Sequence, residues 1–349
     1  MAQPANTFDA YDAGSTSLTG LSNREDLADV IYNIAPTETP FLMYAKRGTA
    51  RNAKCEWLTD TLKEAASNYQ IEGDDYAGET RTPPVRLHGY TQISAKPLTV
   101  SGTQEVIDKA GRKSEIAYQL ALQAKEIKRD IERHICGFAT AADATALGAG
   151  VVNGSSYPNT LGSSTAGRTT ANLGTWINTN VDENGSTPPT QTVVGQPDDG
   201  DSREPGTPRP LLESTLKKVI RQAWTEGGNP STIVVDPFNK QVISSFTGGT
   251  TRFDRSEDKR LVTAVDVYVS DFGDHTVIPD RFLVQPISTE GTACYVLDMN
   301  YWGINYLRPF LQKPLATTGD AEKRLLLAEW TIVAHNEKAS GAIFDLTQS

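Results

Sequence analysis

The segment from Ser114 to Phe138 constrains the fold of this chain more than any other stretch. Apolar side chains recur in it at helical spacing, namely Ile116, Leu120, Ile127, Ile131, Ile135 and Phe138. Small residues widen this face and charged residues fill the opposite one: Ala117, Ala121 and Ala124 on the first, and Lys125, Glu126, Lys128, Arg129, Asp130, Glu132 and Arg133 on the second. Ser114 is suited to cap the helix and Gly137 to end it. We therefore predict a spine helix roughly 37 Å long, against which the other segments pack from one side.

The composition is that of a soluble globular protein. Hydrophobic residues make up 38% of the chain and the mean hydropathy is -0.40. The apolar runs fall short of the roughly 20 residues that a membrane helix needs, and the N-terminus lacks the features of a secretory signal. The length suggests two or three domains. A net charge of -10 argues against nucleic-acid binding by the whole surface, but not against a protein that encloses nucleic acid without gripping it.

The sequence contains no recognisable catalytic or metal-binding motif. Its cysteines are odd in number and far apart (Cys55, Cys136 and Cys294), which indicates reduced thiols made in a cytoplasm. The histidines have no metal-binding spacing: His88, His134, His275 and His335. We expect His134, near the end of the spine helix, to interact with the helix dipole or with solvent. Phosphate loops and nucleophile signatures are also missing, so we predict no catalytic residue, no cofactor and no metal.

The region before the spine helix reads as an arm followed by a projecting hairpin. Residues 1–22 suggest a flexible arm and 24–33 a short helix, followed by an apolar anchor at 41–44. A basic stretch comes next (Lys46, Arg47, Arg51 and Lys54), either a solvated loop or a contact with acidic groups or phosphate. Extended segments near 56–58 and 85–94 flank an acidic tip (Glu72, Asp74, Asp75 and Glu79) and predict a hairpin. A lone hairpin is marginally stable, so we expect it to rest on another copy of the protein.

The region after the spine helix divides into an irregular and a regular part. A short helix over 103–110 leads into the spine, and the periodicity then vanishes over about 141–210. That length exceeds normal loops, so we expect an insertion, a linker or a surface domain. Helices over 211–226 and 237–246, a buried strand over 232–236 and a hairpin over 265–278 then predict a compact α/β unit. Strands near 294–297, 303–307 and 325–334 follow, and we expect them to return to the spine.

The order of these segments resembles the major capsid proteins of tailed bacteriophages, an α+β class with the Hong Kong 97-type capsid fold. Short stretches are similar in particular to the SU-ten-like branch of that group, and their shared order spans most of the chain. They are DLADVIYNIAPTETPF (26–41), EWLTDTL (56–62), KRDIE (128–132), GGNP (227–230), SDFG (270–273), TGD (318–320) and LLLAEWTIVAHN (325–336). Residues 141–210 depart from the pattern and look like a lineage-specific surface insertion.

This resemblance implies a role for each segment. The implied parts are an N-terminal arm and anchor (1–54), an E-loop hairpin (55–100), a P-domain spine helix (101–140), a polar insertion (141–210), an A-domain (211–290), and return strands of the P-domain with the C-terminus (291–349). The E-loop would lie over a neighbouring subunit, and the chain would assemble into hexamers and pentamers of an icosahedral head around double-stranded DNA. The implied partners are other copies of itself, a separate scaffolding protein, a portal, and decoration or minor capsid proteins. The implied location is the virion, after assembly in the host bacterial cytoplasm.

Charged residues supply the candidate contacts between subunits. We expect the acidic tip to meet a neighbour's Lys46, Arg47, Arg51 and Lys54, and we expect Arg129 and Arg133 on the spine to face neighbours. Individual surface ion pairs contribute roughly 0–1 kcal/mol, but a shell repeats each contact many times.

Two alternatives remain open at this point. One is an encapsulin-type nanocompartment shell of the same fold, which neighbouring genes would distinguish: portal and terminase genes for a phage, a cargo enzyme gene for an encapsulin. The other is a metal-dependent hydrolase using Asp271, Asp274 and His275, although turn residues with tolerant backbone angles explain that cluster more simply.

Overall fold

A computed structural model of the chain describes residues 37–63, 65–73, 75, 78, 81–109, 111–147, 151–246, 266–283, 291–317 and 319–348. The arm over 1–22 and the helix over 24–33 expected from the sequence lie outside these residues. Where the structure describes the chain, no helix is both long and apolar enough to cross a membrane.

The predicted spine helix is present as α3 (Glu115–Cys136). The Ser114 hydroxyl accepts the Ala117 N–H at 3.2 Å, and the Gly137 N–H donates to the Arg133 carbonyl at 2.8 Å. Ile127, Ile131 and Ile135 are fully buried. These contacts confirm the cap, the end and the central part of the predicted apolar face.

The two faces of α3 differ from the prediction at several residues. Ala117 and Ala121 are exposed rather than buried. Glu132, which we placed on the charged face, is fully buried because it lies under α1 (Pro40–Tyr44). His134 is also buried, and its ring stacks on that of Tyr157 at 4.2 Å. Burial lowers the pKa of His134 to about 4, so the imidazole is neutral near pH 7 and the expected solvent or dipole role is wrong.

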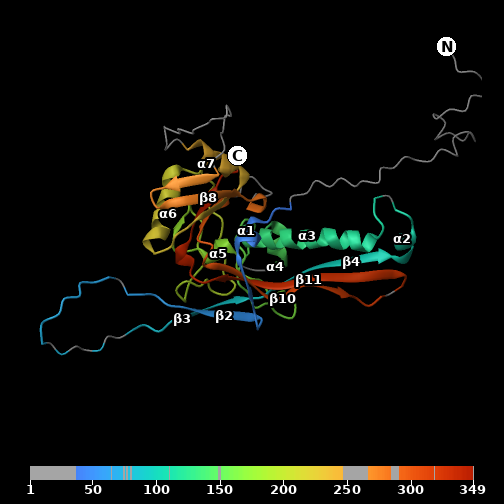
Figure 1. Cartoon of the computed structure of the whole chain (residues 1–349), viewed down its shortest axis with the longest axis horizontal. Coiled ribbons are helices and arrows are strands. Elements are labelled where there is room, and N and C mark those ends of the chain that lie inside the picture. The colour runs from blue at the N-terminus through green and yellow to red at the C-terminus, as the bar shows by residue number, and fades with distance from the viewer. Residues whose placement is uncertain are drawn as a thin grey trace, which may run out of the picture.

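A four-stranded sheet packs against the spine helix. Its order is β1 (Lys46–Thr49), β10 (Trp302–Pro314), β11 (Ala321–Ala334) and β4 (Gln92–Ser101). Figure 1 shows α3 lying lengthwise along this sheet, beside β4 and β11. Ala328, Trp330 and Ile332 alternate along β11 within the same core as the α3 isoleucines. The expectation that late strands return to the spine is therefore confirmed for β10 and β11.

The predicted hairpin is formed by β2 (Lys54–Thr59) and β3 (Val85–Tyr90), which pair antiparallel from Lys54 opposite Tyr90 to Thr59 opposite Val85. The indole of Trp57 donates to the Ala334 carbonyl at 2.9 Å and fixes β2 to the body. The described residues of the segment 60–84, called the projecting loop below, extend away from the body at one end of the molecule (Figure 1). The short helix α2 (Gly102–Val106) lies at the opposite end and is shorter than predicted.

A second sheet of six strands forms the α/β unit. Its order is β5 (Val181–Asp182), β12 (Gly341–Leu346), β9 (Thr292–Leu297), β6 (Thr232–Val235), β8 (Gly273–Pro279) and β7 (Val267–Ser270). The helices α6 (Glu213–Thr225) and α7 (Pro237–Ser245) and the hairpin β7–β8 match their predictions, and short turns of helix follow at Arg281–Leu283 (η1) and Glu337–Ala339 (η2). β9 and β12 pair within this sheet rather than returning to the spine, so residues 291–349 contribute to both sheets.

Part of the segment that we expected to be a surface insertion lies in the core. It contains α4 (Ala141–Leu147) and α5 (Leu173–Trp176), and Leu173, Trp176 and Ile177 are fully buried. Some of its buried polar groups bond within the segment: the buried Arg203 guanidinium donates to the carbonyls of Gly174 and Ile177 at 3.2 and 3.1 Å. The surface interpretation is wrong because this segment folds through specific hydrogen bonds, which leave no periodic signal in the sequence.

Candidate assembly surfaces

The projecting loop presents apolar side chains to solvent. Leu62, Tyr69 and Ile71 are 94, 87 and 75% exposed. Glu72 and Asp75 follow them and are exposed, whereas Asp74 and Glu79 lie outside the described residues. Single exposed apolar residues are ordinary, but several on one loop that leaves the body mark a contact surface.

A groove of about 380 Å³ lies on the body where α1, β1, β10 and α3 meet. Its apolar lining comes from Leu42, Met43, Tyr306 and Phe310, and Met43 is 74% exposed. Arg47 and Lys128 line the same groove and make it basic. An exposed apolar floor with cationic side chains fits an apolar segment that carries acidic groups.

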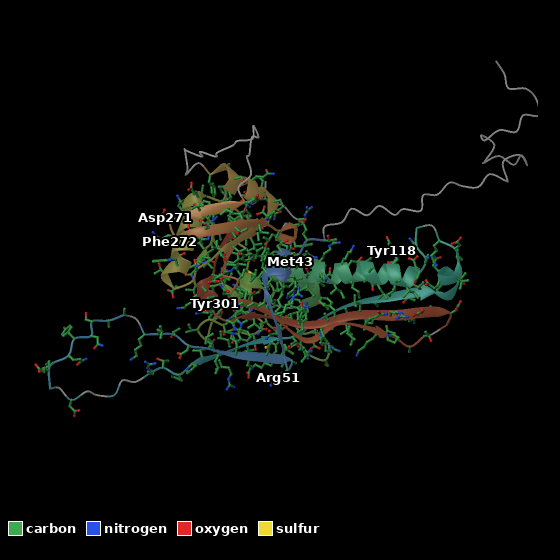
Figure 2. All side chains as sticks on the ribbon, viewed as in Figure 1. Met43, Arg51, Tyr118, Asp271, Phe272 and Tyr301 are labelled. Atoms are coloured by element: carbon green, nitrogen blue, oxygen red, sulfur yellow. The ribbon has the colours of Figure 1, made fainter. Side chains whose placement is uncertain are left out.

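The predicted basic stretch divides between two surfaces. Lys46 donates to the Asn300 carbonyl at 2.9 Å and Lys54 pairs with Glu56 at 3.1 Å, so both already have partners within the subunit. Arg47 and Arg51 are exposed. Figure 2 shows Met43 at the level of α3 and Arg51 beside the hairpin. Arg47 is therefore the member of the stretch that belongs to the groove.

The base of the hairpin is held by a polar cluster that the sequence did not reveal. The Asp199 carboxylate accepts the Tyr90 hydroxyl at 2.9 Å and the Asn159 amide at 3.1 Å, and it contacts the His88 imidazole at 3.1 Å. Burial, reinforced by Asp199, raises the pKa of Tyr90 to about 12, so its phenol remains a donor. These bonds join β3 to residues 159–199 and fix the direction in which the loop leaves the body.

The two arginines proposed on the spine lie in different surroundings. The Arg133 side chain is partly exposed and pairs with Asp143 at 3.3 Å. Arg129 is half-buried and lies over the Phe282 ring, with 6.0 Å between the guanidinium carbon and the ring centroid. Arg133 is thus the more accessible of the two to a neighbouring subunit.

Comparison with known proteins identifies the family. A model of the SU10 major capsid protein family matches residues 5–347. The chain belongs to this family. It is 24% identical over 359 aligned positions to the major capsid protein of Escherichia phage Phieco32, an alignment that covers 99% of this chain and 98% of that one. The predicted family is therefore confirmed.

Solved capsid structures share the fold at low identity. A chain of the cyanophage A-1(L) capsid asymmetric unit has a TM-score of 0.59 at 16% identity and covers 95% of this chain and 99% of that one. A chain of Microbacterium phage Oxtober96 has a TM-score of 0.58 at 11% identity, with 97 and 99% covered. The Hong Kong 97-type capsid fold is confirmed, and the protein is a structural, non-enzymatic component of a phage capsid shell.

The hydrolase alternative fails in this SU10-family chain on geometry as well. His275 and Asp274 are neighbours on β8, where successive side chains point to opposite faces: His275 is buried and Asp274 is exposed. The His275 imidazole contacts the Ser270 hydroxyl at 2.7 Å, and burial lowers its pKa. Asp271 lies exposed at the outer edge of the sheet (Figure 2). The three side chains do not converge on one point.

Proposed function

We propose that this shell protein assembles as hexamers and pentamers of an icosahedral phage head that encloses double-stranded DNA. The observation that carries the proposal is the projecting loop, which exposes apolar side chains and extends away from the body of its own subunit (Figure 1). A surface on one side of a subunit that fits a different surface of the next copy generates rings and closed shells. The net charge of -10 suits an inner wall along which DNA packs without adhering.

The proposed contact places the projecting loop of one copy in the groove of the next. Tyr69 and Ile71 would cover Leu42, Met43 and Phe310, while Glu72 and Asp75 would approach Arg47 and Lys128. Loop and groove are complementary in both apolar character and charge. The sequence led us to expect contacts between the acidic tip, which includes Asp74 and Glu79, and the whole basic stretch. The position of the groove narrows this expectation to contacts near Arg47. Arg51 and Arg133 remain available to a different neighbour.

Assembly of loop variants tests this contact. Ile71→Asp removes an apolar group at the proposed docking point and should abolish particle formation, while the subunit keeps its circular dichroism spectrum and melting temperature. Asn68→Asp is the matched control, because it adds the same charge to an exposed position of the same loop. Light scattering and negative-stain microscopy report the result. Normal particles from Ile71→Asp would refute the docking site.

A charge exchange tests the pairing of the acidic tip. Arg47→Glu should weaken assembly at low salt, and adding Glu72→Lys should restore it, since the exchange returns opposite charges to the contact. Asp74→Lys combined with Asp75→Lys should also impair assembly at low salt. Normal assembly of that double variant, or no rescue by the exchange, would refute the electrostatic part of the proposal.

The remaining partners are proposed from the family resemblance. They are a separate scaffolding protein, a portal, and decoration or minor capsid proteins, with assembly in the host bacterial cytoplasm. Co-expression with the genes that neighbour this one tests them, since a required scaffold should convert aggregates or free subunits into uniform particles.

A further inference from the structure

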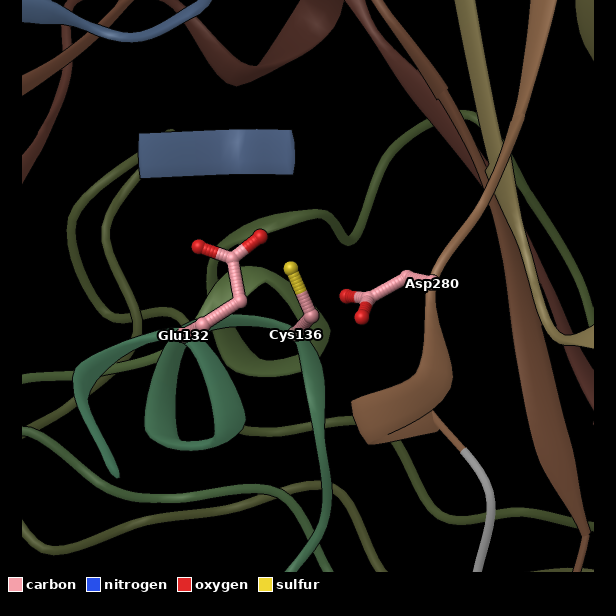
Figure 3. Close-up of side chains that lie close together, drawn as sticks. All are labelled: Glu132, Cys136 and Asp280. Atoms are coloured by element: carbon pink, nitrogen blue, oxygen red, sulfur yellow. The ribbon is translucent and has the colours of Figure 1, made fainter. Parts of the chain in front are cut away.

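Three side chains with metal-ligating atoms meet in the interior, outside the assembly surfaces. Glu132 and Cys136 lie one turn apart on α3, and Asp280 follows the last residue of β8. All three are fully buried. One carboxylate oxygen of each acid and the Cys136 Sγ lie within 4.8 Å of one another. Figure 3 shows the sulfur between the two carboxyl groups.

The buried carboxylate of Asp280 is only partly satisfied by hydrogen bonds. Its Oδ1 accepts the Phe282 N–H at 2.9 Å, whereas its Oδ2 has no partner within hydrogen-bonding distance although the residue is fully buried, and the donor that faces the carboxyl group is the weak S–H of Cys136. In Figure 3 this carboxyl group points toward Cys136. A buried carboxylate oxygen without a partner costs free energy, and a cation between the three residues would supply one.

Glu132 is already held in position. Its two carboxylate oxygens accept the backbone N–H groups of Phe41 at 2.6 Å and Leu42 at 3.0 Å, so α1 fixes the orientation of the group. Each oxygen keeps a further lone pair. Backbone groups that orient a ligating carboxylate in this way are a regular part of metal sites.

We propose that Glu132, Cys136 and Asp280 form a structural site for a divalent transition-metal ion, with Zn²⁺ as the best match. A thiolate with two carboxylates favours Zn²⁺, whereas Mg²⁺ and Ca²⁺ prefer ligand sets made of oxygen alone. Binding displaces the thiol proton and any proton on the carboxyl groups to solvent, and forms the sulfur–metal and oxygen–metal bonds without oxidation or reduction. The ion would join α3 to the end of β8 and, through Glu132, to α1.

The site was not apparent from the sequence because its third ligand is distant along the chain. Glu132 and Cys136 have the i, i+4 spacing that places two ligands on one helix face, and this was the available signal.

Metal content and thermal stability of the full-length chain test the proposal. The protein is stripped with a chelator, dialysed, supplied with Zn²⁺ or Co²⁺, and desalted. We expect one Zn²⁺ retained per chain, a higher melting temperature with Zn²⁺, and a thiolate-to-metal absorption band with Co²⁺. Cys136→Ser should lower Zn²⁺ affinity by at least about tenfold and abolish the band. Cys294→Ser changes the other buried cysteine and should leave both intact.

Asp280→Asn provides a second variant in case Cys136→Ser does not fold. The amide oxygen of this variant still accepts the Phe282 N–H, but the negative charge is lost, so Zn²⁺ retention should fall. The control variant Cys294→Ser should retain Zn²⁺ and show the Co²⁺ absorption band as the wild type does. Absence of retained Zn²⁺ in the wild type, or equal retention by wild type, Cys136→Ser and Asp280→Asn, would overturn the proposal.

Discussion

Asp182 connects the irregular segment to the helix that follows it. Its carboxylate accepts Lys218 Nζ at 2.6 Å and pairs with Arg209. Burial alone would raise the pKa of this carboxyl group, but the bonds from Lys218 and Arg209 prevail and lower it below the ordinary value of 3.8. A carboxylate with a lowered folded-state pKa stabilises the protein above its unfolded-state pKa, and this contribution disappears as the pH falls through the folded-state pKa.

Asp182→Asn should therefore destabilise the subunit in a pH-dependent way. Above pH 5 we expect a loss of roughly 1–2 kcal/mol in the free energy of unfolding, measured by urea denaturation. The difference between wild type and variant should shrink as the pH falls below about 4, because the unfolded chain then holds a proton on this carboxyl group that folding must release. A difference that stays constant from pH 7 to pH 3 would show that the charge of Asp182 is not responsible.

Sequence reasoning was least successful in predicting the burial of individual polar side chains. The apolar side chains of the spine could be predicted because their burial follows helical periodicity. Glu132 and His134 could not, because their partners come from distant segments: the backbone of Phe41 and Leu42 for one, and the Thr170 carbonyl for the other. Without knowledge of such a partner, a polar side chain is predicted to be exposed.

At the scale of elements, the two faces of α3 should respond differently to substitution. Ile131→Asp places an unpaired charge in the core, a cost that exceeds the stability of most domains, and should give no folded subunit. Arg133→Ala removes a partly exposed pair with Asp143 and should change the unfolding free energy by less than about 1 kcal/mol, while it alters assembly. Circular dichroism and light scattering on both variants separate the effects, and identical behaviour would contradict the assignment of the faces.

The polar cluster around Asp199 at the base of the hairpin can be tested by substitution. Asp199→Asn weakens the bonds to Tyr90 and His88, so the β3 amides should exchange with solvent roughly fivefold faster, equivalent to about 1 kcal/mol. Asp198→Asn is the matched control, because Asp198 contacts Thr192 rather than the hairpin. Hydrogen exchange followed by mass spectrometry distinguishes them. Equal exchange of β3 in the two variants would mean that this cluster does not hold the loop.

Most elements could be predicted, because helices such as α3 and α6 carry clear periodic patterns and the strand β11 contains a long apolar run. The irregular segment could not, since its core position depends on the hydrogen bonds of Arg203 and on the single anchor at Leu173–Trp176. β12 also went unrecognised. It is fully buried on both faces and therefore shows no alternation.

At the scale of the whole molecule, the order of the elements was more informative than any motif. No single stretch identified a capsid protein. The resemblance to capsid proteins came from the order of four segments: an arm, a projecting hairpin, a spine helix and a returning sheet. What one chain cannot specify is which surface of a neighbour receives the loop, because that contact exists only between copies.

Cryo-electron microscopy of particles assembled from the full-length protein tests the central claim most directly. We predict closed shells in which the projecting loop of each subunit lies over an adjacent copy, with Tyr69 and Ile71 in the groove beside Met43 and Phe310. A chain that remains a compact monomer under all assembly conditions, with or without its scaffold, and folds the loop back onto its own body, would contradict it.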